Sequence, residues 1–196
     1  MPRTATPPTI DGIIRPVECN GADPAKAMVV AQGIQGEKVE PRSVAWLLAD
    51  SACLYVAIDN AVDKATPLTA GQAWGQDDAV ELAFRDPALG KAAPILVLRG
   101  YANGRFESSD EAGAPPDAVK RAAEGVVYKA TAADVGRWVA TWRVPFAAIG
   151  VDPKKSTKLA FNLSVHKTAG PAWVMWVGTD AASWEVGNAG TLALGR

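Results

Sequence analysis

Three carboxylates crowd the stretch QDDAVEL, which follows Trp74 in a polar segment that also carries a glycine. Asp77 and Asp78 precede a run of strand-like alternation, and Glu81 lies inside it. Paired carboxylates catalyse glycoside hydrolysis, and a carboxylate also accepts hydrogen bonds from ligand hydroxyls. Because successive strand side chains point to opposite faces, only some of the three can face one cleft. The alternative is a solvated strand start with no ligand.

Other catalytic chemistry has little support in the sequence. His166 is the one histidine, and no GxSxG motif accompanies it, so a hydrolase triad is disfavoured. The sequence contains no CxxC, GxGxxG or GxxxxGK[ST] motif, which leaves no indication of a zinc site, a nucleotide or a hydride cofactor. Cys19 and Cys53 are expected to be buried thiols, with one disulfide as the alternative.

Charge and hydropathy narrow the class of partner. The 196 residues hold 20 Lys+Arg against 21 Asp+Glu, without a dense basic run, so nucleic acid is not an expected partner. The longest apolar runs, such as VAWLLA and AWVMWV, are far shorter than the roughly 18 residues that cross a bilayer. No membrane partner is expected. The start, MPRTATPPTIDG, lacks the layout of a secretory signal.

Short apolar bursts bounded by Gly, Pro, Asn or Asp are typical of strands and predict the elements that must position these residues. They cover residues 27–32, 43–49, 53–59, 79–84, 93–99, 125–132, 136–144, 158–166, 172–178 and 190–195. About ten such strands predict an all-β fold, an antiparallel β-sandwich of jelly-roll type. Residues 115–125 predict one short helix. No linker divides the chain, so we expect a single domain over 1–196, with 1–8 as a loose N-terminal tail.

Six segments stand in an order that resembles a family 9 carbohydrate-binding module, or a close relative in the same β-sandwich group. They are TIDGIIRPVECNGA, SVAWLLADSACLYVAI, AWGQDDAVELAFRD, GRWVATWRVPFAAIGVDP, KLAFNLSVH and SWEVGNAGTLALG. The resemblance spans Ile10 to Leu194. It implies a non-catalytic module that holds the end of a β-glucan or xylan chain, or a mono- or disaccharide, between two tryptophans.

The same resemblance assigns site residues. Trp74 takes the place of the first family tryptophan and Trp184 that of the second, while the motif carboxylate maps onto Glu81 and the arginine of the next strand onto Arg99. The sequence departs from the family at Cys19 and Cys53, which replace aromatic residues, and at Ser164, which replaces a ligand-binding glutamine. The asparagine that the family carries just before its last tryptophan is also missing, since DAAS precedes Trp184.

A pyranose ring has apolar C–H faces and a hydroxyl rim, so its site needs flat aromatic rings and polar groups around them. Trp74 and Trp184 would supply the aromatic walls, and Glu81 and Arg99 would read the hydroxyls. For Glu81 and Arg99 the alternative is a simple ion pair between strands. Trp173 and Trp176 should point to opposite faces of one strand, and Trp176 is the secondary aromatic candidate. The remaining rim candidates are Asp77, Asp78, Ser164 and Asn103.

Two other functions stay open at this point. Related sandwiches bind haem for electron transfer, and the only axial ligands on offer are His166 with Met175 or Met28. A glycoside hydrolase would use Asp78 and Glu81.

The remaining expectations concern cofactors, partners and location. No cofactor is required, although the loop IDNAVD at 58–63 offers oxygen ligands for a structural calcium ion. The expected partner is an oligo- or polysaccharide. We expect a monomer in the extracellular space or periplasm that is not itself an enzyme but a module of a larger polysaccharide-degrading enzyme, tethered to its catalytic domain.

Overall fold

The computed structural model describes residues 1–19, 23–170 and 173–194. Its eleven strands are β1 (Met28–Gln32), β2 (Lys38–Ala49), β3 (Cys53–Ala61), β4 (Ala79–Arg85), β5 (Leu96–Tyr101), β6 (Phe106–Ser109), β7 (Val127–Asp134), β8 (Arg137–Pro145), β9 (Lys158–His166), β10 (Trp173–Met175) and β11 (Gly190–Ala193). The one α-helix is α1 (Pro116–Gly125), and the short 3-10 turns include η1 (Pro16–Glu18), η3 (Pro24–Lys26), η4 (Pro87–Leu89) and η5 (Val186–Asn188).

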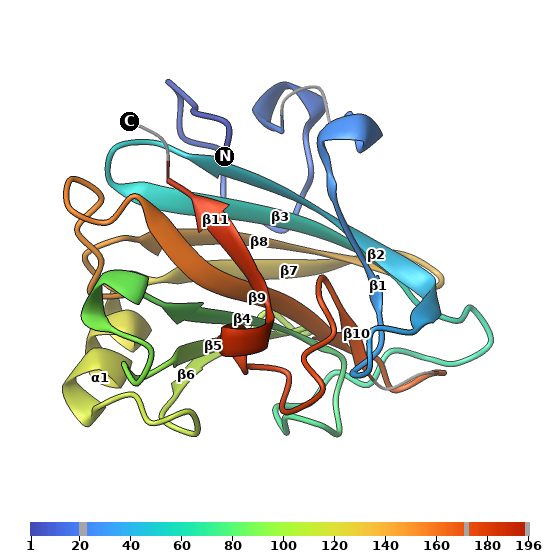
Figure 1. The fold of residues 1–196 in the computed structure, drawn as a ribbon. Coiled ribbons are helices and arrows are strands. Elements are labelled where there is room, and N and C mark those ends of the chain that lie inside the picture. Colours follow the sequence, from blue (N-terminus) through green and yellow to red (C-terminus); the bar gives the residue numbers. More distant parts are fainter. Residues whose placement is uncertain (20–22, 171–172, 195–196) are drawn as a thin grey trace.

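The strands form one antiparallel sheet that folds over on itself into two layers (Figure 1). Its order is β6-β5-β4-β9-β10-β1-β2-β3-β8-β7, and β11 pairs with β9 beside this path. The layer β6-β5-β4-β9 faces the layer β1-β2-β3-β8-β7, and short β10 joins them. Between the layers, the Tyr128 hydroxyl of edge strand β7 donates to the Tyr101 carbonyl of β5 at 2.8 Å. The expected all-β sandwich is confirmed.

The core lies between the two layers and is built by alternation along each strand. On β8, Trp138 and Trp142 point inward and are completely buried, and Leu54 and Ile58 do the same on β3. Gly100 of β5 makes room for this packing, because a Cβ there would lie 2.4 Å from the Tyr128 ring and 2.6 Å from the Trp142 ring. Apolar burial of this extent is the main driving force for a sandwich of this size.

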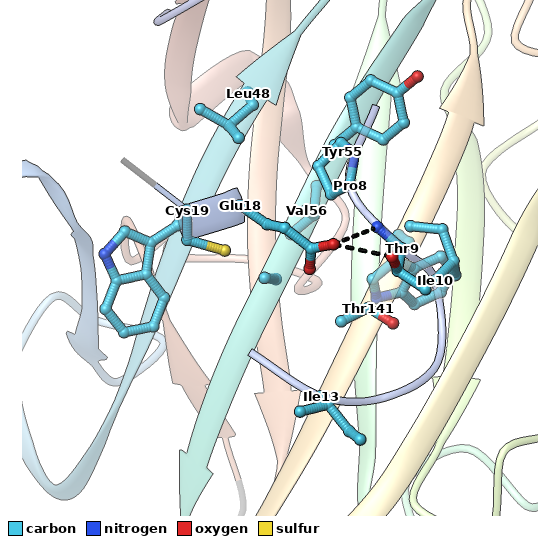
Figure 2. A pocket seen from close by; sticks show the side chains of 13 residues that line it. Pro8, Thr9, Ile10, Ile13, Glu18, Cys19, Leu48, Tyr55, Val56 and Thr141 are labelled. Atoms are coloured by element: carbon cyan, nitrogen blue, oxygen red, sulfur yellow. Dashed lines mark hydrogen bonds between the residues drawn. The ribbon is translucent and has the colours of Figure 1, made fainter. Parts of the chain in front are cut away.

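The N-terminal segment covers the outer face of β2, β3 and β8 (Figure 2). Glu18 anchors it by accepting hydrogen bonds from the Thr9 backbone N–H at 3.1 Å and the Thr9 hydroxyl at 2.8 Å. Beneath the segment, Cys19, Trp46 and Ala57 form a small second core. The hollow left under it measures only about 10 Å³, so nothing larger than a water fits there.

The first residues are more ordered than expected. The tail over 1–8 was predicted to be loose, but Arg3 bridges to Ala49 and the backbone of Thr4 donates to the Ala49 carbonyl at 2.8 Å. The terminal amine of Met1 donates to the Ala193 carbonyl at 3.1 Å. These residues pair with the end of β2 through backbone hydrogen bonds. Backbone pairing requires no particular side chain, so the sequence carried no signal for it.

Ten of the strands overlap the predicted ones, and α1 lies where the helix was expected. β6 was missed because its sequence, FESS, carries a single large apolar residue. Both cysteines are free thiols, as expected, with Cys19 buried and Cys53 half-buried. In the described part of the chain, no helix is long and apolar enough to span a membrane.

Candidate functional site

Trp74 and Trp184, far apart in the sequence, line one groove of about 340 Å³. This volume lies at the small end of the roughly 300–1,000 Å³ that is typical of small-molecule sites. The groove is also lined by Ile34, Gly75, Glu111, Trp173, Ala181, Ala182 and Ser183. Two of its loops, the one before β4 and the one between β10 and β11, lie at the lower side of Figure 1, away from the two termini. Both predicted tryptophans are therefore brought to one site.

Asp77 shapes the turn that presents Trp74. Its carboxylate accepts from the backbone N–H of Gly71 at 3.1 Å and of Ala73 at 2.7 Å, and its own N–H donates to the Ala73 carbonyl. Gly75 completes the turn with φ of 78°, a conformation that glycine adopts without strain. Asp77 is buried and thus holds the loop from behind rather than reaching into the groove.

Asp78 and Asn103 brace the same loop. The carboxylate of Asp78 accepts from the Thr69 N–H at 2.8 Å and from the Thr168 hydroxyl at 2.8 Å, and it is 1% exposed. The Asn103 amide donates to the carbonyls of Ala70 and Gly71, both at 3.0 Å. These hydrogen bonds fix the position of the Trp74 loop. Neither Asp78 nor Asn103 lines the groove.

The Trp184 loop is held from the sheet by polar side chains of β9. Asn162 donates to the carbonyls of Val177 and Ser183, at 3.1 and 3.2 Å. Ser164 donates to the same Ser183 carbonyl at 3.3 Å and is buried. Ser164 therefore supports the loop beside Trp184, and the expected contact with a ligand through water stays a prediction.

Glu81 and Arg99 are direct partners across β4 and β5. Arg99 Nε donates to Glu81 Oε2 at 3.0 Å, and the Ser183 hydroxyl donates to Glu81 Oε1 at 2.6 Å. Burial raises the pKa of Glu81, while the Ser183 hydrogen bond and the charge of Arg99 act in the opposite direction. With both oxygens engaged and 1% exposure, Glu81 matches the structural alternative of an ion pair between strands.

Arg99 also connects the two aromatic walls. Its Cζ lies 4.6 Å from the centroid of the Trp74 ring, which is a cation–π geometry. Its Nη2 donates to Oε2 of Glu111, and Oε1 of Glu111 accepts from Trp184 Nε1 at 3.4 Å. A continuous polar chain thus runs from beneath Trp74 to Trp184.

Trp173 takes the place in the groove that was assigned to Trp176. Its ring packs edge-on against Trp74, with centroids 5.1 Å apart, and against His166 at 4.7 Å. Trp176 lines a different hollow near Met28 and Leu192 and packs on Phe161. Strand alternation separates the two tryptophans correctly, but it does not say which face becomes the groove.

The residues of the alternative functions have structural partners. His166 is buried, and its Nδ1 lies 2.8 Å from the Asp77 carbonyl. Met175 is fully buried, and Met28 is part of the core boundary. Asp78 and Glu81, the two carboxylates that a hydrolase would use, are both 1% exposed and are engaged in the hydrogen bonds described above.

The loop proposed for calcium uses its carboxylates elsewhere. Asp59 forms a bidentate pair with Arg137 at 2.6 and 2.7 Å, and Asp63 accepts from the Ala65 N–H. No group of three or more His, Cys, Asp or Glu side chains in the described ranges could hold a metal ion. Structural calcium stays a prediction that a chelator titration tests.

Comparison with solved structures places this architecture. A family 9 carbohydrate-binding module from Caldicellulosiruptor kristjanssonii in complex with cellotriose matches with a TM-score of 0.69 at 16% identity, covering 98% of this chain and 91% of that chain. The protein has the fold of a family 9 carbohydrate-binding module. A second structure of a family 9 module from the same organism, in complex with glucose, matches with a TM-score of 0.60 at 14% identity, over 92% of this chain and 91% of that chain. No protein-family profile and no curated protein sequence matches the chain.

Two groove residues with aromatic or charged side chains, Trp173 and Glu111, were not predicted as site residues from the sequence. The sequence placed Trp173 and Trp176 on opposite faces of one strand, so it indicated that one of them could be near the site, but it did not indicate which. Glu111 lies in the loop between β6 and α1, in the polar stretch SSDEAGAPP, where nothing distinguishes one carboxylate from the next. Only the folded chain brings Glu111 to the groove, beside Trp184.

Proposed function

We propose that this protein is a non-catalytic carbohydrate-binding module that holds the end of a β-glucan or xylan chain, or a mono- or disaccharide, between Trp74 and Trp184. The observation that carries the proposal is that both indoles line one open groove together with the carboxylate of Glu111, which accepts from Trp184 Nε1. The two structural neighbours that bind cellotriose and glucose support it.

The chemistry of the groove suits a neutral sugar. Indole faces match the apolar C–H faces of a pyranose, and the hydroxyl rim needs acceptors and donors that are fixed in place. If each indole covers about 40–50 Å² of sugar, burial contributes about 1 kcal/mol per face. Hydrogen bonds to charged groups add about 1.5–3 kcal/mol each, so with one or two of them the dissociation constant should be roughly micromolar to millimolar.

The position of Arg99 selects the face of Trp74 that a sugar can use. The guanidinium lies over one face of this indole, so a sugar that stacks on Trp74 would have to use the opposite face. Trp173 supports Trp74 at its edge and widens the aromatic wall. The walls are prepared before binding, since both loops are held by buried hydrogen bonds, and less ordering entropy is lost on association.

Binding without catalysis fits the placement of the carboxylates. A hydrolase needs one carboxyl group to protonate the leaving oxygen and a second to act on the sugar. Asp77, Asp78 and Glu81 are buried in structural hydrogen bonds, which leaves Glu111 as the carboxylate that lines the groove within the described chain. The proposal includes an extracellular or periplasmic location, where polysaccharides occur, and a monomeric state with or without a tethered catalytic domain.

The test is a titration of intrinsic tryptophan fluorescence with glucose, cellobiose, xylobiose and galactose. Trp74→Ala and Trp184→Ala should each weaken binding about fivefold or more, because each removes one apolar wall. Trp176→Phe is the matched control, since Trp176 lines another hollow. Unchanged binding in both groove variants would refute the proposed site, and a Soret band or release of reducing sugar would favour the alternatives.

A further inference from the structure

We propose that Glu111 is the carboxylate that binds the sugar hydroxyls and that it makes the groove selective for neutral over anionic sugars. This inference rests on the proposed sugar-binding function. Glu111 lines the groove together with Trp74, Trp173 and Trp184, and its side chain is 49% exposed. Its backbone N–H donates to the Ser109 hydroxyl, which fixes the loop after β6.

Three carboxylates surround Arg99, and their exposure differs. Glu81 is 1% exposed, and its two oxygens are occupied by Arg99 and Ser183. Glu107 is 44% exposed, lies 3.9 Å from Arg99 Nη1 and accepts from the Tyr101 hydroxyl, but it does not line the groove. Glu111 is the member of this set that a ligand in the groove can reach.

Glu111 keeps acceptor capacity for a ligand. A carboxylate has about four lone-pair sites, and the two hydrogen bonds from Arg99 and Trp184 use two of them. The bond from Trp184 Nε1 is long, at 3.4 Å, so a sugar hydroxyl can replace or share it at low cost. Two oxygens of fixed spacing suit two adjacent hydroxyls on a pyranose.

The charge of Glu111 gives the selectivity. The hydrogen bond from Arg99 lowers the pKa of Glu111 below its usual range, so the group is ionised at neutral pH and only accepts. Arg99 is already balanced by buried Glu81, which leaves the negative charge of Glu111 facing the groove. A uronic acid would bring a like charge beside it, and this interaction is unfavourable.

The experiment measures binding of glucose, cellobiose and glucuronate by calorimetry for the wild type and for the variants Glu111→Gln and Glu107→Gln. We expect Glu111→Gln to weaken glucose and cellobiose binding about tenfold and to reduce the preference for glucose over glucuronate. Glu107→Gln removes one negative charge near the same arginine and should leave both affinities within about twofold.

The outcomes separate this proposal from the proposed function. If Trp74→Ala loses sugar binding while Glu111→Gln binds glucose and glucuronate like the wild type, the role of Glu111 is refuted and the sugar site stands. Equal effects of Glu107→Gln and Glu111→Gln would also refute it, since they would show a general charge effect. If the wild type binds none of the sugars, both proposals fail. Glu111→Asp, which keeps the charge with a shorter reach, should retain the preference against glucuronate, and thermal unfolding confirms that each variant folds.

Discussion

The guanidinium of Arg99 lies over the indole of Trp74, with its Cζ 4.6 Å from the ring centroid, while its Nε holds Glu81 at 3.0 Å. One side chain therefore belongs to the buried structure of the sandwich and also contacts Trp74, which lines the groove. The stability of the fold and the placement of the aromatic platform are coupled through it.

Removal of Arg99 should be costly. Arg99→Met leaves the carboxylate of Glu81 buried without its cationic partner, and breaking a buried pair from one side costs about 3–5 kcal/mol. Urea denaturation of the variant measures the loss. The double variant Glu81→Leu/Arg99→Met should recover part of it, because no unpaired charge then remains in the interior. A double variant less stable than Arg99→Met would contradict this account.

Gly100 should not tolerate a side chain. A Cβ would meet Tyr128 at 2.4 Å and Trp142 at 2.6 Å, both in the interior, so Gly100→Ala should destabilise the protein by about 1–3 kcal/mol through overpacking. Gly90→Ala is the comparison, since that position has open space, and its cost of about 1–3 kcal/mol should come from backbone strain alone, because φ of 95° with ψ of 166° is a conformation essentially restricted to glycine. Thermal melts measure both losses, and an unchanged midpoint in Gly100→Ala would argue against the close packing.

Loss of Asp77 should impair the groove without unfolding the protein. Asp77→Ala releases the backbone N–H groups of Gly71 and Ala73, so the Trp74 turn loses its brace. We expect a stability loss of about 1–3 kcal/mol and weaker glucose binding. The exposed Asp110→Asn is the control, and it should change neither quantity. Wild-type affinity in a destabilised Asp77→Ala would show that the turn holds its shape without this carboxylate.

Lys167 should make stability rise with pH above neutrality. The side chain is 1% exposed and donates to the carbonyls of Pro41 and Ala61, and burial lowers its pKa from 10.5 to about 8, against the opposing charges of Asp78 and Glu40. Between these two values the unfolded chain binds more protons than the folded one, so the free energy of unfolding increases as pH rises.

The Lys167 contribution is isolated by comparison with Lys167→Met, which cannot titrate. From pH 7 to pH 10 the wild type should gain about 1–3 kcal/mol in unfolding free energy relative to this variant. Urea denaturation at several pH values gives both curves, and other titrating groups cancel in the difference. A difference that stays flat across the range would disprove the prediction.

The two thiols should differ in reactivity. Burial raises the pKa of Cys19 to about 11 and also raises that of half-buried Cys53, so few thiolates form at neutral pH. In the native protein, N-ethylmaleimide at pH 8 should label Cys53 well before Cys19, as followed by mass spectrometry. Both should react rapidly in guanidinium chloride, and a faster native reaction at Cys19 would contradict the cover over that residue.

Most strands were predictable because each is a short run of mainly apolar residues that ends at Gly, Pro, Asn or Asp. β6 was not, since an edge strand that is half-exposed needs few apolar residues, and FESS has one. Trp74 and Trp184 were predicted from the resemblance, and Trp74 also from its polar, glycine-bearing surroundings. The roles of Asp77, Asp78 and Asn103 were not, because the same oxygen can accept from a ligand hydroxyl or from a loop N–H, and only the path of the loop decides between them.

The strap formed by residues 8–19 over β2, β3 and β8 limits the kind of surface this protein can meet. Adhesion to a crystalline polysaccharide needs a broad aromatic plane, and no aromatic side chain in the described ranges is exposed on the outside of the sheet. Under the proposed function, we therefore expect sugar contact at the groove lined by Trp74 and Trp184. Short soluble sugars should compete fully with an insoluble polymer for it.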